Sequence, residues 1–233
     1  ALSGPAFSDI VTRINNHWAN KAEYMNELAK QDGTKIIDFA EQDISKWSRA
    51  SGSFNNKTVY ELVDSSEIRI PKALHASISK LDDWDTLGCT QIDSPFPDGY
   101  AVTTFWAKGG PNTPELILEW VEKDGSRWMG IIQLTTSWKR YALLPKDFRF
   151  WQDKSPANRG GQDDCFKPEN AARLSVGLSD GISKQQKGIA HEYWVADIQA
   201  AKAPANNIDF SSPLIESISP QYKIHSTQAE MLL

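Results

Sequence analysis

Sulfur-containing residues and histidines are scarce in this chain. Among its 233 residues there are two cysteines, three methionines and four histidines. Cys89 and Cys165 lie far apart and in no C-x-x-C spacing, and the histidines form no H-E-x-x-H pattern, so neither kind of zinc site is predicted. The two cysteines either pair in an exported protein or are two separately buried thiols, and the sequence leaves both alternatives open.

Long apolar runs and an excess of positive charge are also missing. No stretch approaches the ~20 consecutive apolar residues of a membrane-spanning helix, so no membrane span is expected. The formal net charge is -5. Because nucleic acid is held chiefly by clustered Lys and Arg, we exclude it as a partner. The chain starts at Ala1 with small residues, as after removal of a leader or an upstream region, which predicts a secreted or periplasmic protein.

The first and last segments differ from the middle of the chain in composition and in the spacing of their apolar residues. Residues 1–34 predict a helical N-terminal arm, because Ile10, Val11, Ile14 and Trp18 recur near the helical period and a helix-stop signal follows. Residues 201–233 begin with a linker-like composition and predict a tail that leads to a missing domain.

Residues 35–200 predict an all-β fold. Short runs rich in Val, Ile, Thr and aromatic residues alternate with Gly, Pro, Asn and Asp clusters, which indicates a two-sheet antiparallel β-sandwich. Asp124-Gly125 marks a tight hairpin turn. The runs are 35–39, 58–63, 74–80, 100–108, 115–122, 127–134, 139–144, 172–178 and 192–198.

Five segments in the correct order resemble a known family, the jelly-roll carbohydrate-binding modules of galactose-binding-like type. They resemble its opening strand, its middle strand, its central hairpin, a strand-and-loop motif of the form W-x-x-Y-x-L-P-x-x-F, and its closing strand. The five segments are 36–47, 104–109, 122–128, 136–148 and 191–198.

The resemblance implies a function and a cofactor. Such modules bind a polysaccharide or an oligosaccharide without cutting it, and they are appended to glycan-degrading enzymes. It also implies a structural calcium held by Asp38, Glu41 and Asp197, with ordinary surface and turn carboxylates as the alternative. This chain departs from the family pattern at Ala40 and Ala196, where acids are common. The alternative function is a structural accessory domain that packs against the catalytic domain of a glycoside hydrolase or lyase.

Glycan recognition requires aromatic platforms beside planar polar groups. Arg127 and Trp128 are neighbours on one strand and point to opposite faces of it, so only one of them can face a ligand groove. Arg127 and Glu119 are the favoured polar residues of this groove. Four other tryptophans, Trp47, Trp106, Trp138 and Trp194, are interpreted as core residues because they lie within strand motifs. Trp84 is predicted to lie on an acidic loop after a strand. The candidate ligand residues are Trp84, Tyr100, Glu119, Arg127, Trp128, Trp151, Asn158 and Arg159.

Enzymatic activity is not predicted. Glycoside hydrolysis requires a pair of carboxylates, and acids such as those of the 115–124 hairpin ordinarily form just a solvated face. No nucleophile motif and no metal-ligand spacing accompanies them.

Overall fold

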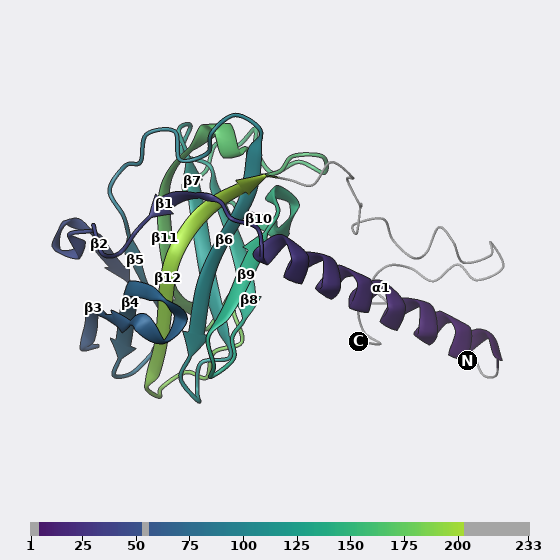
Figure 1. Cartoon of the computed structure of the whole chain (residues 1–233), viewed down its shortest axis with the longest axis horizontal. Coiled ribbons are helices and arrows are strands. Elements are labelled where there is room, and N and C mark those ends of the chain that lie inside the picture. Colours follow the sequence, from purple (N-terminus) through teal and green to yellow (C-terminus); the bar gives the residue numbers. More distant parts are fainter. Residues whose placement is uncertain (1–4, 53–55, 203–233) are drawn as a thin grey trace. The chain divides into compact units, whose positions relative to one another are not determined.

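The chain folds into a sandwich of two six-stranded antiparallel sheets, as a computed structural model shows (Figure 1). The structure describes residues 5–52 and 56–202. The predicted all-β jelly-roll class with an N-terminal helix is therefore confirmed. Sheet A contains β1 (Thr34–Ile37), β3 (Thr58–Ser65), β4 (Ile70–Ile78), β6 (Tyr100–Gly109), β9 (Lys139–Leu143) and β12 (His191–Lys202). Sheet B contains β2 (Ser48–Ser51), β5 (Trp84–Gly88), β7 (Glu115–Glu122), β8 (Arg127–Gln133), β10 (Phe148–Trp151) and β11 (Ala171–Ser179).

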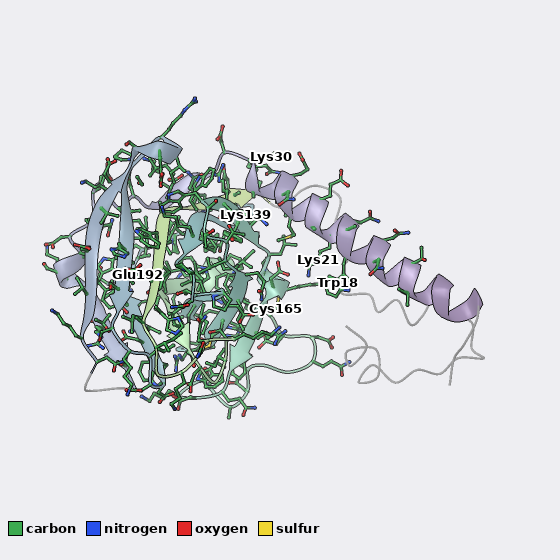
Figure 2. The ribbon with its side chains drawn as sticks, turned by 90° about the horizontal axis from the view of Figure 1, so that it is seen from below. Trp18, Lys21, Lys30, Lys139, Cys165 and Glu192 are labelled. Carbon is green, nitrogen blue, oxygen red and sulfur yellow. The ribbon has the colours of Figure 1, made fainter. Side chains whose placement is uncertain are left out.

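Helical structure is confined to α1 (Pro5–Ala29) and four short 3-10 turns within the described residues. The turns are Ile44–Lys46, Ser66–Ile68, Pro145–Asp147 and Pro168–Asn170. On α1, the Lys21 ammonium lies 5.7 Å from the centre of the Trp18 ring (Figure 2). The helix up to Glu27 clusters separately from the compact unit that begins at Leu28. The predicted domain boundaries stay a prediction, and the tail from residue 203 on lies outside the described residues.

Strand order sets which side chains share a face. Sheet A runs β3-β4-β12-β6-β9, and β1 pairs with the second half of β12. Sheet B runs β10-β8-β7-β11-β5-β2. Since side chains alternate along a strand, each sheet presents one row of residues to the core and the next to the outside.

The core lies between the two sheets. From β7 it receives Leu116, Leu118 and Trp120, all fully buried, and from β12 it receives Tyr193 and Val195. The Trp120 ring stacks on Phe166 at a centroid distance of 5.8 Å, and its Nε1 donates to Thr103 Oγ1 at 3.1 Å. Burial of large aromatic rings with their polar atoms paired stabilises this contact between the sheets.

A buried ionic cluster fixes the two short strands at one edge of sheet B. The Asp85 carboxylate on β5 is fully buried and accepts hydrogen bonds from Arg49 Nη2 at 2.5 Å, Tyr60 OH at 2.7 Å and Thr58 Oγ1 at 2.8 Å. A buried charge requires such pairing, because it has lost its water. Burial, with the neighbouring Tyr193 and Asp85, raises the pKa of Tyr60 well above its usual range.

The nine predicted runs correspond to nine of the twelve strands; β7 has the predicted ends, and the other eight strands differ from their runs at one or both ends. Strands β2, β5 and β10, of four, five and four residues, were not predicted. The predicted hairpin is the β7–β8 turn, where Gly125 has φ 89° and the Asp124 carboxylate accepts from Ser126 N at 2.9 Å. A residue with a side chain rarely adopts that backbone conformation, which explains the glycine.

Two further features of the described residues bear on function. No helix there is long and apolar enough to cross a membrane. Cys89 is buried and Cys165 (Figure 2) is partly buried, and both are free thiols, which corresponds to the second of the two cysteine alternatives. Burial raises the pKa of the Cys89 thiol.

Candidate functional site

The outer face of sheet B brings together four of the predicted ligand residues. On β7, Leu116, Leu118 and Trp120 point into the core, so the residues between them point outward, and the same alternation applies to the neighbouring strands. The predicted residues on this face are Trp84, Glu119, Arg127 and Trp151. Their role in binding stays a prediction, but their shared face is a property of the fold.

A polar network occupies the middle of this face. Arg127 Nε donates to Glu119 Oε1 at 2.5 Å and Arg127 Nη2 donates to Glu119 Oε2 at 3.2 Å, which is a two-bond carboxylate pair. Ser175 Oγ on β11 donates to Glu119 Oε2 at 3.1 Å. Burial is the largest single effect and lowers the pKa of Arg127, but the hydrogen bond and the charge of Glu119, with the charge of Asp153, together raise that pKa above its usual value. Three strands thus hold one preorganised polar group.

One half of the face is covered by a loop and the other half is open. After β11, the chain returns across Glu115, whose carboxylate accepts from Lys184 N at 2.6 Å and whose backbone oxygen accepts from Gln185 Nε2 at 2.7 Å. In the other half, Arg149 and Arg173 are exposed. Arg149 and Arg173 are therefore accessible to a ligand, whereas the Arg127 side chain between them is only 25% exposed.

Exposed tryptophans mark two opposite corners of the face. Trp84 is 36% exposed at the start of β5, and Trp151 is 38% exposed at the end of β10. The prediction of Trp84 on a loop is therefore corrected to a strand. Four strand spacings and about six residues of register separate the two rings, which corresponds to roughly 25–30 Å. Only an extended ligand can contact both.

The prediction of Trp128 as a ligand residue is corrected by its burial. Its side chain is 1% exposed and lies in the core, where its ring meets Phe150 edge-on at 5.2 Å, so it offers no free face to a ligand. The alternation that places Arg127 outside places Trp128 inside.

The prediction of Arg159 as a ligand residue is also corrected, because its guanidinium is already bound within the protein. Its side chain is 9% exposed, Nη1 donates to Glu122 Oε2 at 2.8 Å and to Asp124 Oδ2 at 2.6 Å, and Nε donates to Asp164 Oδ2 at 2.8 Å. The guanidinium also lies 5.4 Å from the Trp128 ring centre. Arg159 thus clamps the loop after β10 onto the β7–β8 hairpin and has no donor left for a sugar.

The clamp perturbs the ionisation of its members. Hydrogen bonds to Glu122 and Asp164 raise the pKa of Arg159 above its usual range. The hydrogen bond from Arg159 is also the main cause that lowers the pKa of Asp164 to about 2. Arg159 and Asp164 are therefore both charged at neutral pH.

The two remaining ligand candidates are not brought to the tryptophan corners by any described contact. Tyr100 starts β6 in sheet A, packs partly against the core and has the Lys202 ammonium 5.5 Å from its ring centre. This places it in the other sheet from Glu119 and Arg127. Asn158 is exposed on the loop that Arg159 clamps.

The carboxylates predicted to hold calcium are arranged around a lysine. Asp38 forms an ion pair and hydrogen bond with Lys35 Nζ through Oδ2, and its Oδ1 accepts from Ala40 N at 3.0 Å. Asp197 and Glu41 add weaker attraction to the same ammonium and help to raise the pKa of Lys35. Among the described residues, no group of three or more His, Cys, Asp or Glu side chains is placed to hold a metal ion. This donor set, with a lysine inside it, does not fit calcium as arranged, and the calcium site stays a prediction.

The outer face of sheet A carries three tryptophans that the sequence analysis interpreted as core. Only Trp47 of the four is buried in the core. Trp194 stacks on His75 at 4.5 Å and 6°, and the Lys108 ammonium lies 5.0 Å from the Trp194 ring centre and 4.9 Å from that of Trp138. Trp106, on the same side of β6 as Lys108, is partly exposed. We call His75, Trp106, Lys108, Trp138 and Trp194 the aromatic ladder.

Comparisons with known proteins identify the fold. No family model matches the chain, and no curated protein matches its sequence. The family 11 carbohydrate-binding module of the cellulosomal cellulase Lic26A-Cel5E of Clostridium thermocellum matches 76% of this chain and 98% of its own, with 15% identity and a TM-score of 0.55. The structure of the same family's module in complex with a β-1,3-1,4-mixed-linked tetrasaccharide matches 75% of this chain and 98% of its own, with 15% identity and a TM-score of 0.54.

A longer enzyme contains a similar domain. An exo-β-agarase matches 84% of this chain with 30% of its own length, at 13% identity and a TM-score of 0.52. At these identities the likeness concerns the fold, which is that of carbohydrate-binding module sandwiches.

Proposed function

We propose that this chain binds a polysaccharide or an oligosaccharide on the outer face of sheet B and breaks no bond in it. The observation that supports this most directly is the pairing of an exposed ring with a preorganised polar group, since Trp151 lies opposite Arg127 in the register of β10 and β8. Sugar rings stack on tryptophan through their C–H faces, and their hydroxyls bind to planar charged groups such as the Arg127–Glu119 pair.

The carboxylates of this face support a non-catalytic role. Glu115 and Glu119 lie four residues apart on one strand, which corresponds to about 13 Å and exceeds the ~5–10 Å that separates the two acids of a glycosidase. Both are buried and engaged, Glu119 with Arg127 and Glu115 with Gln133 and two groups of the loop that covers it. Neither is free to act as a general acid or base.

The binding face would serve to target an attached glycan-degrading enzyme, which places the chain outside the cytoplasm, secreted or periplasmic, where polysaccharides are met. An exposed tryptophan adds on the order of 1 kcal/mol per stacked sugar, so short sugars bind weakly and attachment to a second module raises the avidity.

A binding screen tests this proposal. The purified chain is titrated with soluble polysaccharides while tryptophan fluorescence is recorded, and insoluble ones are tested by pull-down. We expect saturable binding to one class of glycan, loss of binding in Trp151→Ala, and full binding in Trp194→Ala, a matched change on the other sheet. Equal binding by Trp151→Ala and the wild type would show that the site is wrongly assigned.

The aromatic ladder favours a second candidate function, that of a structural accessory domain. The stack of His75 on Trp194, with Lys108 between Trp194 and Trp138, leaves few ring faces for a sugar but forms a rigid surface rich in tryptophan. Such surfaces are typical of protein contacts. In this case the chain binds no glycan, and Trp194→Ala lowers the thermal stability of the full-length enzyme while Trp151→Ala does not.

A further inference from the structure

The open half of the sheet B face carries a cluster of arginines in a chain that is acidic as a whole. Arg127 on β8 and Arg173 on β11 are both register partners of Val121 on β7, so their backbones lie about 10 Å apart. Arg149 on β10 is opposite Met129, two residues along from Arg127, which gives a diagonal of roughly 7–8 Å. We call Arg127, Arg149 and Arg173 the arginine triad.

The members of the triad differ in whether the protein already neutralises them. Arg127 is paired with Glu119, and its Nη1 lies 3.5 Å from the Asp153 carboxylate. Within residues 5–52 and 56–202, the side chains of Arg149 and Arg173 form no ion pair or hydrogen bond, and both are exposed. Two guanidinium groups therefore stand uncompensated on one open face.

The two tryptophan corners differ in charge. Asp82 and Asp83 come immediately before Trp84, whereas Trp151 has the unpaired Arg149 and the already paired Arg127 beside it. Trp151 is 38% exposed, and no cation lies over its ring among the described contacts. A sugar stacked on Trp151 therefore lies within reach of arginine donors.

We propose that the arginine triad with Trp151 selects an acidic glycan, one whose sugar rings carry carboxylate or sulfate groups. This rests on the proposed function, because it names the ligand class of the same face. The planar guanidinium forms two parallel hydrogen bonds to a carboxylate or a sulfate, which a neutral hydroxyl cannot match. The acidic groups of the ligand meet Arg149 and Arg173, while one sugar face stacks on Trp151.

The negative net charge of the chain does not oppose this. Exposed charges farther apart than the ~8 Å screening length at physiological salt interact weakly, so the local triad determines what binds there. The same reasoning predicts that binding weakens as salt is raised.

The test compares glycans that differ in charge. The full chain is titrated by calorimetry with polygalacturonate, with a sulfated galactan, with agarose oligosaccharides and with mixed-linkage β-glucan, at low and at high salt. The variants are Arg149→Met, Arg173→Met, Trp151→Ala and the control Arg69→Met, which removes an exposed arginine beside the β3–β4 turn of sheet A. Melting curves confirm that each variant is folded.

We expect an acidic glycan to bind more tightly than both neutral ones. Arg149→Met and Arg173→Met should each lower that affinity about threefold to fivefold, as expected for exposed ion pairs, and Arg69→Met should leave it unchanged. Binding to polygalacturonate alone identifies a carboxylate, and binding to the sulfated galactan alone identifies a sulfate.

The contrary outcomes separate the two proposals. If a neutral glycan binds with an affinity equal to or higher than that of the acidic glycans, and the arginine variants leave this affinity unchanged, the acidic ligand class is overturned. This result would leave the proposal of glycan binding intact. No binding to any glycan overturns both proposals. Duplex DNA is titrated as a further polyanion. If it binds with the affinity of the acidic glycan, and the arginine variants lower that affinity, the selectivity is overturned, because the triad then acts as a general anion site.

Discussion

The Arg159 clamp gives the most quantitative prediction, a loss of stability in Arg159→Met. The substitution keeps the apolar stem but removes the cation from Glu122, whose side chain has no exposed surface, and from Asp124 and Asp164. Removal of one partner from a fully buried ion pair costs about 3–5 kcal/mol. Here Glu122 keeps a hydrogen bond from Lys167 N at 2.8 Å, and Asp124 and Asp164 reach water, so we expect about 2–3 kcal/mol.

Thermal melting followed by circular dichroism measures this loss. For a domain of this size, 1 kcal/mol corresponds to roughly 2–4 °C in Tm, so the variant should melt about 4–12 °C lower at pH 7. The control Arg69→Met removes an exposed arginine and should melt within about 1 °C of the wild type.

The pH dependence of the same variant provides an independent check. Because Arg159 lowers the pKa of Asp164 to about 2, the Asp164 carboxylate stabilises the folded state above its unfolded pKa of about 3.9, and this contribution is lost as the pH falls toward 2. The gap in Tm between wild type and Arg159→Met should therefore be narrower at pH 3 than at pH 7. A gap below about 1 °C at pH 7, or one that does not narrow in acid, would refute this account of the clamp.

Three further predictions concern the rest of the molecule. Trp151→Ala should lower affinity for short oligosaccharides about fivefold, whereas Trp84→Ala, at the far corner, should affect only long chains, as a calorimetric titration against ligand length will show. Asp85→Asn leaves Arg49 and Tyr60 with a weaker acceptor and should cost about 2–4 kcal/mol in the free energy of unfolding measured by urea titration. Since Lys35 already holds Asp38, calcium or chelator should leave the Tm unchanged, and a chelator-sensitive rise with calcium would instead support the predicted calcium site.

Most of the fold could be predicted from the sequence, because alternation is a local property. Strands of seven residues or more, such as β6 and β7, display both of their faces within one run, and the Asp-Gly turn fixes the hairpin between β7 and β8. Strands β2 and β10 have four residues each and are stabilised by contacts that are remote in sequence, such as Arg49 with Asp85. No local pattern contains that information.

The outward position of the tryptophans in β6 and β12 could also have been predicted from alternation along these strands. In β6, Phe105 and Ala107 fill the core, so Trp106 and Lys108 lie on the opposite face, and in β12 Tyr193 and Val195 place Trp194 outside in the same way. The interpretation of these tryptophans as core residues was wrong because it rested on their place within strand motifs and not on the face of the strand to which each belongs. Alternation was the better guide, since a strand buries a residue by its position.

The arginines show what sequence reasoning alone cannot determine. Arg159 and Arg173 are the same residue type, but Arg159 meets three carboxylates because the loop after β10 folds onto the β7–β8 hairpin, and Arg173 meets none among the described residues. A triad requires that β10, β8, β7 and β11 be neighbours, and their order in the sheet is not their order in the sequence. Only the fold therefore shows which arginines, such as Arg149 and Arg173, the protein leaves without an ion pair among its described residues.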